Sequence, residues 1–387
     1  MIEQKALLPE EILEKLETSV HQALVRGKRD QENGTEIDYA LDMLEQLIQW
    51  SYDRYTNIEL EDGCEEEGEE QTWRVHPRDI VRANQICGSF LIKIVSGMLG
   101  EWQDDRGEKA ARLLAHLSGR GAAGAITRTW HFPYLNDNGN RQEYRFKLHE
   151  PSYIGNDIGF KTWGAAPLLA KKLIQQRLIP DLKNRTVLEL GSGTGLVGLC
   201  CDKLGAPQVY LTDYHASVLT NVTINVELNQ SSATVSKLDF IQVAQHYQFP
   251  QQLKQEQEEP KQQISLPPSP TPSVSSVSSA SPSWEDYGKK FDIVIASDLL
   301  YEMEHAEYLP LAVEKLMENE FYFMIPLRPT HVAEVEFFER QMTKVGLIKD
   351  QVADSECEEE EGIVRYRYYK YVRAAQQQQP AESTVVL

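Results

Sequence analysis

The stretch that decides the fold is VLELGSGTGLVG, Val187–Gly198. Its apolar opening predicts a short buried strand. Glycines then stand at alternate positions, namely Gly191, Gly193 and Gly195. An apolar helical pattern opens directly after them, at Leu196. A strand, a glycine-rich turn and a helix in this order let the backbone approach a nucleotide-like ligand over the helix N-terminus.

The spacing of the glycines separates two classes of cofactor. A dinucleotide fingerprint, G-x-G-x-x-G, needs its first glycine directly after the strand, but the sixth position counted from Gly191 is Leu196. The alternative is an acidic residue, one spacer and G-x-G-x-G, for which Glu189 supplies the acid. This pattern resembles the first motif of the S-adenosylmethionine (AdoMet) methyltransferases, whose ligand carries a positive sulfonium that suits a carboxylate. A glycine turn without any ligand is the remaining alternative.

The charge balance of the chain is strongly acidic. Among 387 residues, 59 are Asp or Glu and 39 are Lys or Arg, which gives a formal net charge of −20. Attraction to phosphates needs clustered basic residues, so direct binding of nucleic acid is not expected, whereas a basic partner or substrate suits the charge. The length is sufficient for a full α/β core and a second unit.

The cysteines and the apolar segments bear on the compartment. Five scattered cysteines contain no C-x-x-C pair, which fits a reducing environment without disulfides. The first residues show no basic-then-apolar signal pattern. The most apolar helical segment, Ile86–Leu99, is interrupted by Lys93 and is too short to cross a bilayer. We therefore expect no membrane partner and a cytoplasmic location, with the nucleus left open.

Residues 1–120 predict a helical accessory region. Apolar residues recur there at helical spacing, and proline is a favoured first residue of a helix. Helices are expected over residues 9–26, 35–52, 77–98 and 109–117. No residue pattern in this region indicates chemistry, so we expect it either to bind substrate or to brace the domain that follows.

Residues 121–373 predict an α/β domain. Two alternating segments, 125–134 and 143–148, flank a strong turn signal and predict a β-hairpin. Further strands are expected at 187–190, 208–212, 234–238, 291–296, 321–325 and 366–372, with helices between them, among these 168–179 and 310–318. Residues 251–283 are polar and rich in Pro and Ser, which predicts a disordered insertion, and the tail 374–387 is also expected to be disordered.

Acidic residues follow the second and third strands of this domain. Asp213 lies about twenty positions beyond the glycine turn, where a carboxylate can accept hydrogen bonds from both hydroxyls of a ribose. Asp239 and Phe240 follow the third strand, where the carboxylate can accept from an adenine amino group while the ring packs on the base. The structural alternatives are a helix cap for Asp213, and a turn residue and a core ring for the other two.

Two further motifs carry a more specific resemblance. The loop GFKTW, Gly159–Trp163, precedes the first strand, and Asp298-x-x-Tyr301 follows the strand at 291–296. Together with the glycine turn, they resemble the seven-strand AdoMet methyltransferases of the protein-lysine group, methyltransferase family 16, over about residues 143–372 without the insertion. The resemblance implies an α/β fold with a Rossmann-like, seven-stranded class I sheet, preceded here by the helical region and the hairpin.

The resemblance also implies the residues of the site. The predicted cofactor is AdoMet, and the residues implied to line its site are Trp163, Glu189, Gly191, Ser192, Gly193, Gly195, Asp213, Asp239, Phe240 and Ser297. Asp298 and Tyr301 would face a substrate lysine; the structural alternatives are a helix cap and a packed core ring. Phe240 stands where many members of the family have Trp, so the aromatic ring is retained.

Within the family, the long N-terminal region and GFKTWGAAPLLAK, residues 159–171, look most like the fungal enzymes that methylate a lysine of elongation factor 2. The implied function is an AdoMet-dependent protein-lysine N-methyltransferase that acts on a protein partner. The alternatives are transfer to a protein histidine, an N-terminal amine or a small molecule, and a non-catalytic AdoMet-binding adaptor. A hydrolase is disfavoured, because the chain has no G-x-S-x-G and no metal-spaced His/Cys cluster.

Overall fold

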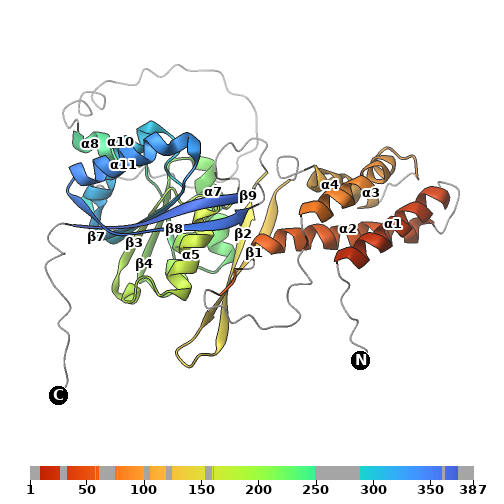
Figure 1. The fold of residues 1–387 in the computed structure, drawn as a ribbon, viewed down its shortest axis with the longest axis horizontal. Helices are drawn as coiled ribbons and strands as arrows, with labels where there is room; N and C mark the ends of the chain where they lie inside the picture. The colour runs from red at the N-terminus through yellow and green to blue at the C-terminus, as the bar shows by residue number, and fades with distance from the viewer. Residues whose placement is uncertain are drawn as a thin grey trace, which may run out of the picture. The chain divides into compact units, whose positions relative to one another are not determined.

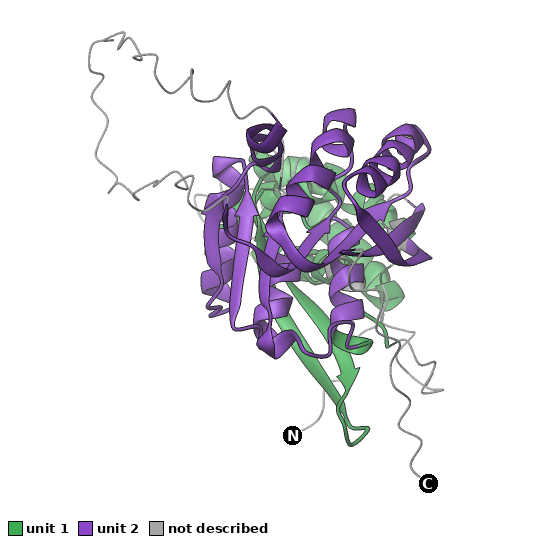
Figure 2. Ribbon diagram, turned by 90° about the vertical axis from the view of Figure 1, so that its left-hand side faces the viewer, with its two compact units in different colours: residues 1–162, 174–176, 359–361 green, residues 163–173, 177–358, 362–387 purple. Residues whose placement is uncertain are grey.

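In the computed structural model, the chain divides into two compact units (Figure 2). The first comprises residues 1–162, 174–176 and 359–361, and the second comprises 163–173, 177–358 and 362–387. The structure describes residues 9–26, 33–56, 58–60, 75, 77–99, 105–118, 124–152, 159, 161–248, 288–359 and 362–373. The insertion predicted at 251–283 and the tail predicted at 374–387 lie outside these residues.

The first unit contains a bundle of helices. They are α1 (Pro9–Arg26), α2 (Asn33–Thr56), α3 (Pro77–Val95) and α4 (Asp105–Leu117). Their apolar stripes face one another, so that Ile12 of α1, Leu47 of α2 and Leu91 of α3 share one buried cluster. The four predicted helices are confirmed with shifted ends. Gly97, at φ +71°, follows the last turn of α3 and explains why this helix ends before Met98.

A β-hairpin completes the first unit, as predicted. Its strands are β1 (Ile126–Leu135) and β2 (Arg141–Glu150). The side-chain oxygen of Asn136 accepts hydrogen bonds from two backbone N–H groups of the turn. The buried rings of Phe132 and Phe146 meet edge to face across the strands. Contacts group this hairpin with the helices, while the functional boundary at residue 121 stays a prediction.

The second unit is built around a seven-stranded sheet (Figure 1). Its strands are β3 (Thr186–Leu190), β4 (Gln208–Asp213), β5 (Thr234–Lys237), β6 (Phe291–Ser297), β7 (Met317–Pro326), β8 (Leu347–Glu359) and β9 (Gly362–Arg373). They lie in the order β5-β4-β3-β6-β7-β9-β8. The strands from β5 to β7 are parallel, and β9 is antiparallel to β7.

The strand order confirms the predicted Rossmann-like class and locates a ligand site. From β3 the chain proceeds outward through β4 to β5 and then returns to place β6 on the other side of β3. The carboxyl ends of β3 and β6 therefore flank a topological switch point, where open α/β sheets bind their ligands. The glycine turn directly follows β3, and Asp298 directly follows β6.

Helices connect the strands and cover the sheet. They are α5 (Ala165–Gln175), α6 (Leu196–Lys203), α7 (Ala216–Leu228), α8 (Phe240–Gln248), α10 (Met303–Leu316) and α11 (Val332–Lys344). α8, α10 and α11 lie together (Figure 1). They share one apolar cluster with the sheet, in which the ring centroids of Phe338 in α11 and Phe323 in β7 lie 5.2 Å apart. In α6 every residue from Leu196 to Cys201 is buried, which explains its continuous apolar sequence.

Three elements differ from the sequence prediction. The pattern does not predict β8, because this edge strand is polar and acidic, and Leu347 is the one buried residue among its described side chains. The segment after Asp239 forms the unpredicted helix α8. Helix α10 begins at Met303 and not near Pro310, which lies inside it; buried residues such as Leu309 offset the hydrogen bond that proline cannot donate.

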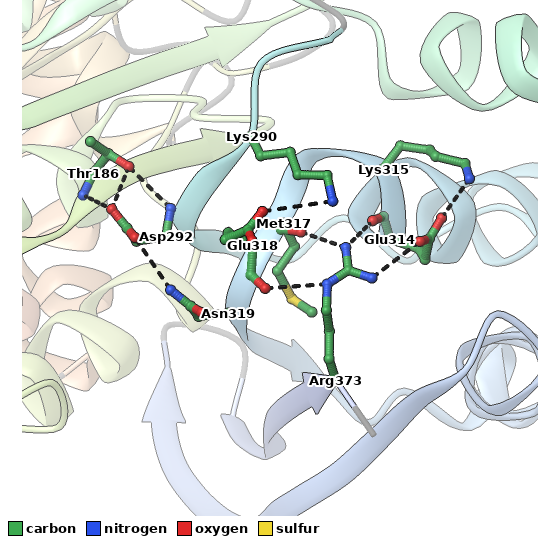
Figure 3. A network of polar contacts seen from close by, with 9 residues as sticks. All are labelled: Thr186, Lys290, Asp292, Glu314, Lys315, Met317, Glu318, Asn319 and Arg373. Atoms are coloured by element: carbon green, nitrogen blue, oxygen red, sulfur yellow. Dashed lines mark hydrogen bonds and ion pairs between the residues drawn. The ribbon is translucent and has the colours of Figure 1, made fainter. Parts of the chain in front are cut away.

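Polar contacts tie together the amino-terminal ends of the parallel strands, at the opposite end of the sheet from the glycine turn (Figure 3). Asp292 of β6 accepts hydrogen bonds from the backbone N–H and the hydroxyl of Thr186 in β3. Arg373, the last residue of β9, pairs with the Glu314 carboxylate and donates to the backbone carbonyls at 314, 317 and 318. One guanidinium thus joins β9 to the end of α10 and the start of β7.

Arg373→Ala tests this clamp. We expect it to lower the free energy of unfolding by about 1–3 kcal/mol, because several partly buried oxygens lose a charged donor. Arg365→Ala is the matched control: Arg365 pairs with Glu356 on the exposed surface, and its loss should cost less than about 0.5 kcal/mol. Urea denaturation measures both values. Equal effects of the two substitutions would contradict a stabilising role of the clamp.

Candidate active site

The glycine turn takes backbone conformations that glycine alone adopts readily. Gly191, Gly193 and Gly195 have φ angles of +60°, +54° and +84°. A Cβ at Gly191 would lie 2.1 Å from Leu299 Cδ2, and one at Gly195 would lie 2.6 Å from Val222 Cγ2. A Cβ at Gly193 would meet nothing within 4 Å. The turn is thus closely packed at its two ends and open at its centre.

Glu189 lies inside the protein, one residue before the end of β3. Its side chain is buried, and Oε2 accepts a hydrogen bond of 3.1 Å from the N–H of Gly198 in α6. Burial raises the pKa of this carboxyl to about 8, and the Gly198 hydrogen bond opposes the rise only in part. Burial therefore favours the protonated, neutral form of Glu189, whose side chain braces the turn against α6.

Backbone hydrogen bonds hold the rest of the turn. The Ser192 N–H donates to the Thr212 carbonyl of β4 at 2.9 Å, and the Thr212 hydroxyl donates to the Glu189 carbonyl at 2.6 Å. The Ser192 hydroxyl is buried and lies near enough to Glu189 to lower the pKa of that carboxyl, but it makes no hydrogen bond of ordinary geometry with the described residues. A buried hydroxyl of this kind is a group that a ligand or a water satisfies.

Asp213 ends β4 with its carboxylate toward the glycine turn. One oxygen accepts a hydrogen bond of 3.4 Å from the N–H of Gly193, and the other accepts one of 3.1 Å from the N–H of His215. Burial raises the pKa of Asp213, and these backbone donors oppose the rise. The carboxylate therefore lies beside the open centre of the turn, which is where the predicted ribose contact requires it.

Asp239 and Phe240 form the start of α8. Asp239 Oδ1 accepts hydrogen bonds from the N–H groups of Ile241 and Gln242, at 2.9 and 3.3 Å, which is the geometry of a helix cap. The Phe240 ring is buried in the core of the sheet unit and meets the His305 imidazole at 5.6 Å. These contacts are structural, and the predicted contacts of both residues with adenine stay predictions.

Asp298 brings a carboxylate and a guanidinium together beside the end of β6. It follows Ser297, the last residue of the strand, with a left-handed φ of +54°, a conformation that recurs at functional sites. Its side chain is 10% exposed, and Oδ2 lies 3.5 Å from Nη2 of Arg328. The Arg328 guanidinium in turn lies 5.8 Å from the ring centroid of Trp163. Acid, cation and indole thus meet in one place.

Tyr301 packs among other rings. It meets the His305 imidazole edge to face at 4.4 Å. Burial, with smaller contributions from Tyr214 and Asp213, raises the pKa of Tyr301 to about 12, so its hydroxyl is neutral. His305 Nδ1 is buried and has no hydrogen-bond partner among the described residues, and burial lowers the pKa of this imidazole.

The predicted residues gather at the carboxyl ends of β3, β4 and β6. β3 pairs with β6 so that Leu190 lies opposite Ala296, and Leu299 fills the space beside Gly191. The segment Asp298–Tyr301 therefore contacts the glycine turn through the Leu299 side chain. Trp163 is connected with this group by Arg328, which contacts both its ring and Asp298. Phe240, which follows Asp239, contacts the His305 imidazole, and His305 in turn contacts Tyr301.

The sequence analysis missed two residues of this group. His305 lies in the first turn of α10, four residues after Tyr301, which precedes the helix, so no helical spacing in the sequence connects the two. Arg328 lies beyond the next strand, and no local pattern connects it with Asp298. The parallel pairing of β6 with β7 brings the two residues together, because both follow the carboxyl ends of these strands.

The residues present fit a nucleotide-like cofactor in space and in chemistry. The centre of the turn is open at Gly193, the Ser192 hydroxyl needs a partner, and the Asp213 carboxylate lies beside both. No group of His, Cys, Asp and Glu among the described residues could hold a metal ion. Within the described ranges, no helix has the length and apolar character needed to cross a membrane. The strand order and this turn define the class of Rossmann-like methyltransferases.

Comparisons with known proteins agree with this class. Residues 141–254 match the family described as lysine methyltransferase. Protein-lysine N-methyltransferase rrg1 of Schizosaccharomyces pombe is 28% identical over 306 residues, which cover 74% of this chain and 86% of that protein. Protein-lysine N-methyltransferase EFM2 of Saccharomyces cerevisiae is 24% identical over 246 residues, which cover 58% of this chain and about half, 51%, of that protein.

Among solved structures, magnesium protoporphyrin IX methyltransferase (ChlM) from Synechocystis PCC 6803 with bound SAM is 14% identical, with a TM-score of 0.35 over 55% of this chain and 79% of that one. Residues 141–254 of the chain match the lysine methyltransferase family, and this match and the two fungal relatives confirm the predicted resemblance.

Two alanine substitutions separate the packing of the turn from the space that it leaves for a ligand. Gly191→Ala should lower the free energy of unfolding by about 2 kcal/mol or more, because the new methyl group strikes Leu299. Gly193→Ala should cost only about 1 kcal/mol, the strain of a left-handed alanine, yet weaken AdoMet binding at least about tenfold. Urea denaturation and titration calorimetry measure the two effects. Wild-type affinity in the Gly193 variant would show that the ligand lies elsewhere.

Glu189→Gln tests the proton on Glu189. Because the native pKa of about 8 lies above the ordinary value of 4.5, the unfolded chain releases this proton first as the pH rises. Glu189 therefore lowers the free energy of unfolding progressively as the pH rises between these values. In melting experiments from pH 5 to pH 9, the stability of the Gln variant relative to the wild type should increase with pH up to about pH 8. A difference that is constant with pH would contradict a protonated Glu189.

Proposed function

We propose that this protein is an AdoMet-dependent protein-lysine N-methyltransferase that modifies elongation factor 2. The packing of the Asp298–Tyr301 segment on the open glycine turn carries the proposal. This contact sets an acid that can receive an ammonium beside the turn that can receive the cofactor. A methyl donor and an amine acceptor would then meet within one site, as transfer between them requires.

The cofactor would be held by residues around the turn. Gly193 leaves the backbone accessible, Asp213 would accept hydrogen bonds from the ribose hydroxyls, and Ser192 supplies a hydroxyl in need of a partner. When bound, AdoMet supplies a methyl group on a sulfonium, so that the N–C bond to the acceptor forms as the S–C bond breaks. The protein itself must align the acceptor and present it without its proton.

The acceptor lysine would reach the site as an ammonium and react as an amine. Removing its proton near pH 7 costs about 4–5 kcal/mol for an unperturbed lysine. Asp298 favours the charged form, so its role is to capture and orient the lysine, and the proton leaves to water before transfer. The neutral Tyr301 can pack along the lysine or hydrogen-bond to its nitrogen. Exclusion of water around the buried Asp298 would oppose this preference for the charged form in part.

The choice of elongation factor 2 rests on the resemblance of residues 159–171 and of the long N-terminal region to the fungal enzymes that methylate this factor. The two fungal relatives, both named protein-lysine N-methyltransferases, support the chemistry and not the particular substrate. A net charge of −20 suits a basic surface on the substrate. An enzyme that modifies elongation factor 2 would act in the cytoplasm, where elongation takes place.

The test is methyl transfer from labelled AdoMet to purified elongation factor 2, with Asp298→Asn beside the wild type. Asn tolerates the left-handed φ of this position, so the substitution removes the charge without straining the backbone. We expect a labelled lysine, and a rate about 10- to 100-fold lower in the variant, the range for losing one charge-assisted hydrogen bond. AdoMet binding by the variant should stay within about threefold of the wild type.

Other outcomes separate the alternatives. Label on a protein other than elongation factor 2 in an extract would keep the enzyme and reject the substrate. Label on a histidine or an N-terminal amine would reject the lysine assignment. AdoMet binding with no transfer to any protein would favour the non-catalytic adaptor. Absence of AdoMet binding would overturn the whole proposal.

A further inference from the structure

The Arg328 guanidinium contacts Asp298, the residue that would receive the ammonium group of the substrate lysine in the proposed function. This guanidinium lies 3.5 Å from the Asp298 carboxylate and 5.8 Å from the Trp163 ring. The Asp298 side chain is 10% exposed and the Arg328 side chain is 39% exposed. The guanidinium is therefore the solvent-facing member of the pair, and the carboxylate is the buried one. An aromatic ring and a carboxylate are the two groups that receive organic cations in proteins. This site thus holds a cation from its own chain.

The surroundings of the pair are acidic. Burial raises the pKa of Tyr301, three residues after Asp298, and the negative charges of Asp213, Glu302 and Asp298 help to raise it. An ammonium that enters such surroundings is stabilised in its charged form, which hinders the loss of its proton. A guanidinium beside Asp298 has the opposite effect, since it offsets the nearest negative charge and never loses its own proton.

We propose that Arg328 is a positioning residue that holds the Asp298 carboxylate and offsets its charge, so that the substrate lysine binds less tightly as an ammonium and loses its proton more easily. The inference rests on the proposed function. It assigns Asp298 two successive partners, Arg328 in the free protein and the lysine in the complex. Trp163 keeps the guanidinium close by when the lysine arrives.

The contact itself is tested without any activity measurement. The Arg328 side-chain N–H signal in the ¹⁵N–¹H spectrum of the full chain is assigned by its absence in Arg328→Gln. We expect this signal to move in both Trp163→Leu and Asp298→Asn. Arg340→Gln serves as a control, because Arg340 is an exposed arginine of α11 paired with Glu336, and it should leave the Arg328 signal in place. A signal unchanged by both site substitutions would overturn the inference.

Kinetics with the substrate that the wild type methylates then test the electrostatic effect. Removal of one partly exposed charge near the lysine should lower KM about three- to tenfold in Arg328→Gln and lower kcat at pH 7 by a similar factor. The loss of kcat should disappear as the pH is raised, because the pKa of the bound ammonium is higher in this variant. Arg328→Lys, which keeps the charge, should restore both parameters, and Arg340→Gln should change neither.

The outcomes keep this inference apart from the proposed function. Parallel losses in kcat at every pH with unchanged KM would show that Arg328 is only structural and would overturn the inference while leaving the enzyme in place. A wild type that transfers no methyl group to any protein would overturn the proposed function and, with it, the effect of Arg328 on the substrate lysine. The spectra would then still decide whether Arg328 holds Asp298.

Discussion

The space left by the missing side chain of Gly191 is the constraint on which the site depends. Leu299 fills this space, and a single methyl group on Gly191 would strike it at 2.1 Å. Because Leu299 follows Asp298 in the chain, the same contact holds the segment that carries Asp298 against the turn that follows β3. Parallel pairing of β3 with β6 brings the two strand ends together, and the glycine allows the segments beyond them to touch. The glycine turn and the segment after β6, which are the proposed cofactor and acceptor sides of the site, therefore pack against each other.

Burial gives the acidic groups around this structure different tasks. Glu189 lies within the core with a pKa raised to about 8, so it serves the turn as a neutral brace. Asp213 has a raised pKa as well, but its two oxygens receive backbone N–H groups beside the open centre of the turn. Asp298 pairs with Arg328. One acid thus supports the backbone, one faces the predicted ribose, and one receives a cation.

The sequence predicted the elements whose patterns are local. Strand β3 and its glycines, the hairpin turn at Asn136 and the amphipathic helices follow from periodicity and turn chemistry within a few residues. The edge strand β8 was not predicted, because Leu347 is its one buried residue among the described side chains. Helix α10 begins before the predicted position, because the burial of its apolar residues outweighs the cost of Pro310. Arg328 was not predicted as a site residue, because it comes close to Asp298 only through the pairing of β6 with β7. The structural alternative for Asp239 was a turn residue, whereas the structure shows it as the cap of α8, a helix that the sequence analysis did not predict.

The most direct measurement of the central claim is a crystal structure of the full chain with S-adenosylhomocysteine. The account predicts that the ligand lies over the glycine turn against Gly193, that its ribose hydroxyls reach Asp213, and that its sulfur faces the space beside Asp298 and Tyr301. A ligand bound away from Gly193, or a sulfur separated from Asp298 by the packed core, would contradict the claim that this contact between β3 and β6 assembles one methyl-transfer site.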